Sequence, residues 1–180
     1  MITTKPLSKG NWHDFVGRTP SDGCDGCWCY NHHIRPGDPD VRGELARRSM
    51  EALLPDGGIN GFVAYLDDPP AGWCAVDTRS SIPGHDCVDD TEPDAWAIHC
   101  LYVPPARRNR GIAGTLVQSA LEFIRSREGR FAETYARPPT LAKAAFAFLP
   151  LESLYLNLGF ARIDSIDPND SRLRLDLNQA

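Results

Sequence analysis

The sequence lacks the features that mark a membrane protein or a secreted disulfide scaffold. It contains no run of about 18 uninterrupted apolar residues, so a transmembrane helix is not expected. The first ten residues hold no apolar run of signal-peptide length. Six cysteines among 180 residues are too sparse for a disulfide framework. These absences favour a cytoplasmic protein with reduced thiols and without a membrane partner.

An excess of basic charge is also lacking. Lysine and arginine number 19 against 24 aspartate and glutamate, for a formal net charge of −5. This balance argues against general attraction to nucleic acid. The negative surplus lies in residues 77–94, which hold six acidic residues and one arginine, and we expect a solvated acidic loop there.

The composition fits one globular domain over residues 1–180, because 42% of the residues are hydrophobic and 24% are charged. Apolar periodicity and turn residues predict helices at 8–17, 41–54, 111–127, 141–148 and 152–158, and strands at 61–66, 72–76, 96–103, 131–136, 160–166 and 172–177. Residues 21–39 read as an irregular segment rich in Cys and His. The last strand alternates strictly, so one of its faces should be solvated. Interleaved strands and helices predict an α/β fold with a mixed sheet.

The most informative segment joins the apolar strand at 96–103 to the following helix. A short basic loop with Arg107, Arg108 and Arg110 leads to small residues at 111, 113 and 114. A helix N-terminus offers unbonded N–H groups and partial positive charge, so it binds anions, and small residues let a pyrophosphate approach the backbone. The segment is neither a Walker motif nor a Gly-x-Gly-x-x-Gly turn. An ordinary helix start with solvated arginines is the alternative.

Two motifs together resemble the GNAT acetyltransferases. Val103-x-Pro105-x-x-Arg108-x-x-Gly111-x-Ala113 is similar to that family's Arg/Gln-x-x-Gly-x-Gly/Ala signature. Downstream, Leu154-Tyr155-Leu-Asn-Leu-Gly159-Phe160 resembles its Tyr-x-x-x-Gly-Phe ending. The resemblance implies a mixed, mostly antiparallel, V-shaped sheet flanked by helices, with acetyl-CoA as cosubstrate in the cleft.

The resemblance also implies which residues hold the cosubstrate. Backbone groups near Leu101, Tyr102 and Val103 would hold the pantetheine and polarise the thioester carbonyl. The pyrophosphate would lie against the backbone of the loop and helix start, formed by Arg108, Asn109, Arg110, Gly111, Ile112, Ala113, Gly114 and Thr115.

Acetyl transfer to an amine needs a proton acceptor for the amine and a proton donor for the thiolate. The family often places the donor at the position of Tyr155; a tyrosine packed in the core is the alternative reading. His99 is the candidate base, because imidazole titrates near neutral pH. It stands four residues before Val103, and alternation predicts that both share one face of the strand. A water molecule as base and a buried neutral His99 are the alternatives.

The segment Cys24-Asp-Gly-Cys27-Trp28-Cys29-Tyr-Asn-His32-His33 resembles a GNAT subgroup with an N-terminal Gly-Cys-Trp-Cys motif. The resemblance implies that Cys27, Trp28, Cys29 and Trp73 line the acceptor side of the cleft. Zinc binding by the cysteines and histidines of the segment, or a redox pair, are alternatives. A second paired cluster is not evident, so no metal is expected.

These observations predict an acyltransferase that moves an acetyl group from acetyl-CoA directly to an amine of a small molecule or protein. The acidic stretch at 77–94 would favour a cationic acceptor, although a solvated loop without that role is an equal reading. A non-catalytic acyl-CoA-binding or sensing module is the second hypothesis, and a small zinc-binding interaction domain is the third. The acceptor and the oligomeric state stay open, although proteins of this family are often homodimers.

Overall fold

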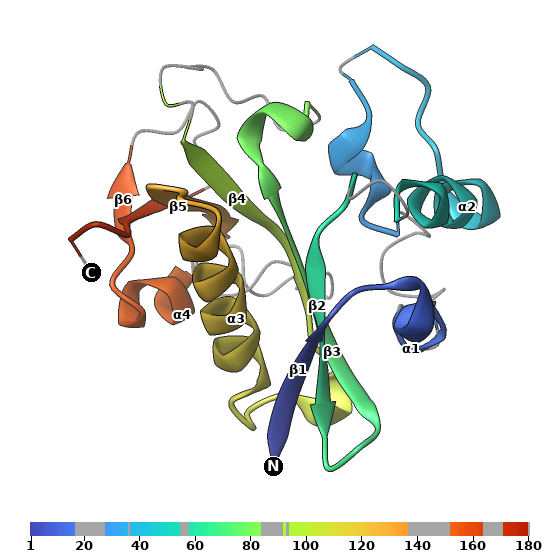
Figure 1. Ribbon diagram of the computed structural model, residues 1–180, viewed down its shortest axis with the longest axis horizontal. Helices are drawn as coiled ribbons and strands as arrows, with labels where there is room; N and C mark the ends of the chain where they lie inside the picture. The colour runs from blue at the N-terminus through green and yellow to red at the C-terminus, as the bar shows by residue number, and fades with distance from the viewer. Residues whose placement is uncertain are drawn as a thin grey trace.

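The chain builds one sheet with helices on both of its faces (Figure 1). The computed structural model describes residues 1–16, 28–35, 37–54, 58–83, 92, 94–136, 152–163 and 171–179. Its strands are β1 (Ile2–Pro6), β2 (Gly61–Leu66), β3 (Pro70–Thr78), β4 (Ala95–Tyr102), β5 (Phe131–Ala136), β6 (Ala161–Ile163) and β7 (Ser171–Asp176). The α-helices are α1 (Trp12–Val16), α2 (Gly43–Leu53), α3 (Ile112–Ser126) and α4 (Glu152–Asn157). Short 3-10 turns are η1 (Lys9–Asn11), η2 (Tyr30–His33), η3 (Arg79–Ser81) and η4 (Pro105–Arg107).

The sheet splits between its two central strands. The strand order is β1-β2-β3-β4-β5-β7-β6, and within the described residues only β4 and β5 pair in parallel. Their ladder runs from Ala95↔Phe131 to Ile98↔Thr134 and then stops. Beyond it, β4 continues against β3 as far as Tyr102, while β5 continues against β7 as far as Ala136. The two halves therefore diverge into the expected V, and Figure 1 shows the separation.

Two apolar clusters cover the two faces of the sheet. On one face, α3 packs over β1 to β4, and its buried positions repeat at helical spacing. The helix lies very close to β3, because an added Cβ at Gly72 would stand 3.0 Å from Ile112 and 3.1 Å from Leu116. On the other face, Phe15 of α1 and Met50 of α2 pack with Trp73 of β3. No helix of the described ranges is long and apolar enough to cross a membrane.

Most predicted elements are confirmed within one or two residues at each end. The sequence does not predict β1, because its three central residues, Thr3, Thr4 and Lys5, are polar and give no apolar signal. The predicted helix at 8–17 is a 3-10 turn followed by the short α1 in the described part. The predicted helix at 141–148 lies outside the described residues.

The expectation of a solvated loop from residue 77 onward is wrong at its start. β3 extends to Thr78, so Asp77 lies inside the sheet and is 2% exposed. Arg79 in η3 is 6% exposed. The side chains of these two residues belong to buried polar clusters, whereas Asp86, Asp89 and Asp90 lie outside the described residues.

The prediction of a solvated face on β7 is also wrong. Arg172 and Arg174 point to the fully buried Glu133 of β5, with N···O distances of 3.0 and 2.6 Å. The guanidinium of Arg79 lies 3.4 Å from the same carboxylate. Side-chain exposures of 11% and 22% show that the two β7 arginines are largely covered. The alternation of β7 therefore separates an apolar face from an ion-pair network.

Glu133→Gln should lower the free energy of unfolding by about 3–5 kcal/mol, because three largely buried guanidinium groups would lose their shared anion. Urea denaturation would measure the change. Glu122→Gln, on the exposed side of α3, is the control and should change stability by less than about 0.5 kcal/mol. Equal effects of the two variants would contradict the assignment of Glu133 as the centre of this network.

Candidate functional site

The loop between β4 and α3 turns the helix N-terminus toward the open end of the V. η4 follows the strand, and two residues with positive φ, Asn109 (59°) and Gly111 (83°), bring the chain into α3. Gly114 has open space where a Cβ would stand, with no heavy atom within 4 Å. A 15-residue helix thus presents its first N–H groups beside a small, uncovered surface, which is the geometry that anions favour.

The arginines of this loop lie around the end of β4. Arg108 and Arg110 are exposed, and Arg108 Nε donates a hydrogen bond to the Val103 carbonyl at 3.0 Å. Leu101 is buried, while Tyr102 and Val103 are half-buried. A ligand that used the Val103 carbonyl would therefore displace the Arg108 side chain. The backbone of Leu101 and Tyr102 pairs with β3 on one side, and the β5 ladder has already ended on the other.

Tyr155 lies beside the point where the sheet splits. Its side chain is fully buried and contacts Phe160, with ring centroids 5.2 Å apart. A hydrogen bond joins its hydroxyl to Thr134, which in turn donates to the Ile98 carbonyl at 3.0 Å. Burial raises the pKa of Tyr155 well above its usual range. The phenol therefore stays protonated, at the last rung of the parallel ladder.

A β-bulge in β4 overturns the predicted orientation of His99. Val76 faces Ile98, but Ala75 faces Cys100, so β4 has one extra residue at position 99. Val103 packs against the α3 side of the sheet, whereas His99 and Cys100 both lie on the opposite face. The alternation that would place His99 and Val103 together is interrupted by the bulge.

On that opposite face, His99 belongs to a buried polar cluster. Its Nε2 lies 3.0 Å from Asp77 Oδ2, and it is 2% exposed. Asp77 Oδ1 accepts hydrogen bonds from Asn60, from the backbone N–H at 3.0 Å and from Nδ2 at 2.7 Å. The His33 ring lies 5.8 Å from the His99 ring, nearly perpendicular to it. Sequence reasoning missed Asp77 and Asn60, because nothing in their spacing links them to a histidine on β4.

Burial dominates the electrostatics of this cluster. It raises the pKa of Asp77 to about 7, against the opposing effects of the Asn60 hydrogen bonds and of nearby His33. It lowers the pKa of His33, although Asp77 and a hydrogen bond with the Ser81 backbone act in the opposite direction. The Nε2 of His99 is directed at Asp77, so the geometry gives no support to a direct contact between that nitrogen and an acceptor amine.

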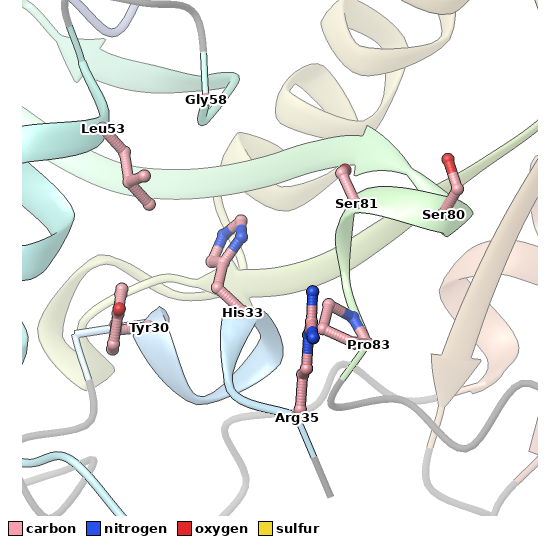
Figure 2. Close-up of a pocket in the computed structure, with 8 residues that line it drawn as sticks. All are labelled: Tyr30, His33, Arg35, Leu53, Gly58, Ser80, Ser81 and Pro83. Atoms are coloured by element: carbon pink, nitrogen blue, oxygen red, sulfur yellow. The ribbon is translucent and has the colours of Figure 1, made fainter. Parts of the chain in front are cut away.

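A pocket of about 430 Å³ opens beside the cluster. It lies between η2, the end of α2 and η3, and Figure 2 shows its lining. The ring of His33 points into the middle of this lining, and the Arg35 side chain rises beside Pro83 (Figure 2). His33 is therefore shared between the pocket and the buried cluster. The remaining lining residues are Tyr30, Leu53, Gly58, Ser80 and Ser81.

The predicted acceptor-side residues lie mainly inside the second apolar cluster. Trp73 is 4% exposed and packs against Phe15 in a tilted arrangement with ring centroids 4.6 Å apart, and Cys29 is 3% exposed. Trp28 packs against the same cluster, and Cys29 Sγ lies 2.7 Å from Cys100 Sγ on β4. Cys24 and Cys27 lie outside the described residues. Packing accounts for these positions, and contact with an acceptor stays a prediction.

The comparisons with known proteins agree with this architecture. A family model described as the acetyltransferase (GNAT) family matches residues 29–147. The chain belongs to the GNAT family of acetyltransferases. No curated protein matches it. The Gly-Cys-Trp-Cys subgroup is not tested by the family match and stays a prediction.

Solved structures share the GNAT fold at low identity. An N-acetyltransferase from Staphylococcus aureus is 12% identical with a TM-score of 0.63, and 98% of this chain and 99% of that chain are covered. A putative acetyltransferase from Salmonella typhimurium with its cofactor acetyl-CoA is 14% identical with a TM-score of 0.59, over 98% and 94% of the two chains. An N-acetyltransferase from Thermoplasma acidophilum in complex with coenzyme A is 16% identical with a TM-score of 0.56, over 98% and 99%.

Two glycines of the α3 start should respond in opposite ways to alanine. Gly111→Ala should destabilise the fold by about 1–2 kcal/mol, because φ is +83° there. Gly114→Ala should leave stability unchanged or raise it by up to about 1 kcal/mol, since the position is helical and uncrowded. Thermal or urea unfolding would measure both. Similar losses in both variants would contradict this description of the loop.

Proposed function

We propose that this GNAT protein transfers the acetyl group of acetyl-CoA to an amine. The observation that carries the proposal is the α3 N-terminus, which stands beside the split between β4 and β5 with Gly114 uncovered. The backbone from Arg108 to Thr115 would bind the pyrophosphate, and Arg107, Arg108 and Arg110 would add positive charge at this end. The pantetheine would run along Leu101 to Val103, where β4 has no partner in β5.

Direct transfer proceeds in one complex of both substrates. The amine nitrogen attacks the acetyl carbonyl, and donors along β4 stabilise the oxyanion. Collapse of this intermediate breaks the C–S bond, and the Tyr155 hydroxyl donates its proton to the departing sulfur. Burial raises the pKa of Tyr155, so the phenol keeps its proton until the thiolate forms beside it.

The second proton, that of the amine, goes to water in this proposal. The Nε2 of His99 is occupied by its contact with Asp77, which favours the water molecule among the two bases considered from the sequence. The acceptor would approach from the face of the sheet that carries α1 and α2, where the pocket beside His33 opens. The volume of that pocket suits a small-molecule amine.

The proposal is tested by incubating the protein with acetyl-CoA and a panel of small amines and peptides, and by following the release of free thiol. Amine-dependent thiol release, with acetylated product found by mass spectrometry, supports acetyl transfer. Tight CoA binding without turnover on a broad panel would instead indicate a non-catalytic acyl-CoA-binding module.

Gly114→Val should weaken CoA binding by at least about tenfold, which corresponds to about 1.4 kcal/mol, because the side chain would fill the surface that the pyrophosphate needs. Isothermal titration calorimetry with CoA measures the dissociation constant. Gln118→Val, at an exposed position one turn later in α3, is the matched control and should bind CoA as the wild type does. Unchanged affinity in Gly114→Val would place the cofactor elsewhere.

Tyr155→Phe should lower kcat by about 100-fold while KM for acetyl-CoA stays within about twofold, since only a proton donor is removed and the ring packing is kept. Steady-state kinetics with a substrate found in the panel would measure both constants. An unchanged kcat would leave Tyr155 a purely structural core residue.

A further inference from the structure

We propose that His33, Asp77 and His99 form a binding site for a divalent transition-metal ion. The three residues come from η2, β3 and β4, and one ring nitrogen of each histidine and one carboxylate oxygen all lie within 4.8 Å of one another. The sequence predicts no metal, and it groups His33 with the cysteines of the 24–33 segment instead. In the described residues, η2 places the ring of His33 beside His99 of β4.

His33 has a buried ring nitrogen with no hydrogen-bond partner among the described residues. Its ring holds a hydrogen bond with the Ser81 backbone, which favours a protonated Nδ1 because Nε2 has no hydrogen-bond partner in the described part of the chain. Nε2 is fully buried and therefore keeps its lone pair away from water. A buried acceptor atom beside a carboxylate is unfavourable unless a proton or a metal ion lies between them.

Hydrogen bonds from outside the cluster hold two of the three candidate ligands in place. Metal-bound histidines usually donate their other ring N–H to a backbone carbonyl or a carboxylate, and metal-bound carboxylates are themselves hydrogen-bonded. His33 has this arrangement through Ser81. Asp77 has it through Asn60, whose two N–H donors hold Oδ1 and leave Oδ2 directed toward His99.

The spacing of the three residues and the adjoining pocket also suit a metal ion. Tetrahedral ligands at zinc distances of 2.0–2.2 Å stand roughly 3.3 Å apart. Asp77 Oδ2 and His99 Nε2 are already 3.0 Å apart, and a ring nitrogen of His33 lies within 4.8 Å of the ligand atoms that these two residues offer. His33 also lines the pocket, so an ion has an entry path and a solvent molecule can occupy a fourth position.

The donor set selects the class of ion. Two imidazole nitrogens and one carboxylate oxygen suit zinc and its neighbours, whereas Mg²⁺ and Ca²⁺ prefer oxygen ligands alone. Zinc is therefore the first probe. Cobalt(II) is the second, because its absorption spectrum distinguishes nitrogen and oxygen ligands from thiolates through a sulfur-to-metal charge-transfer band.

The test uses the full chain, stripped with a chelator and then titrated with Zn²⁺ by calorimetry and with Co²⁺ by absorption. We expect one ion per chain, a higher Tm with zinc, and a Co²⁺ spectrum without a thiolate band. His33→Gln and Asp77→Asn should each weaken zinc binding by at least about 100-fold, and Asn60→Ala by about 10–100-fold. His13→Gln changes a histidine whose side chain is 78% exposed and should leave binding unchanged.

Circular dichroism of the metal-free variants establishes whether they fold. Loss of zinc binding in a folded variant then indicates that a ligand of the site has been removed. Absence of zinc binding by the folded wild type at micromolar concentration would overturn the proposal. A thiolate band that persists in His33→Gln would overturn it as well, since the ion would then belong to the cysteines. None of these measurements uses acetyl-CoA, so their results do not depend on whether the protein transfers acetyl groups.

Discussion

The early end of the parallel ladder between β4 and β5 is the constraint on which the rest of this structure depends. Up to Ile98 and Thr134 the two strands satisfy each other's backbone groups. Past that rung, the ladders of the described residues pair β4 with β3 and β5 with β7, and the sheet opens. The opening brings three features to one place: the end of β4 beyond Ile98, the hydroxyl of Tyr155 through Thr134, and the start of α3. A continuous ladder would close this space.

The bulge at His99 gives the two faces of β4 different chemistry. Before the bulge, Trp96 and Ile98 pack toward α3, and after it Leu101 and Val103 do so. The extra residue lets His99 and Cys100 both point to the opposite face, one toward Asp77 and the other toward Cys29. β4 thus packs apolar side chains toward α3 along its whole length, while the polar cluster lies on the opposite face of the sheet.

The sequence predicts the elements well where apolar periodicity is strong. The helix start with Gly111 and the position of Tyr155 follow from local patterns, because turn residues and helical spacing act over a few positions. The sequence does not predict the bulge, the burial of Asp77 or its contact with His99, because these depend on the register between β3 and β4. The role of Arg172 and Arg174 is missed for the same reason, since an alternating strand reads as solvated unless its neighbour carries a buried carboxylate.

The two buried carboxylates of the sheet show why the Asp77 cluster differs from an ordinary structural network. Glu133 is surrounded by the guanidinium groups of three arginines, so its negative charge is compensated within the protein. Among the ion pairs of the described residues, Asp77 has His99 as its one partner, and His99 is charged only when it is protonated. Its other contacts, from Asn60, are neutral dipoles. A fully buried carboxylate without a permanent cation is costly. The Glu133 carboxylate therefore already has cationic partners, whereas the Asp77 carboxylate would gain most from a bound cation. The imidazole nitrogens beside Asp77 favour a metal ion as that cation.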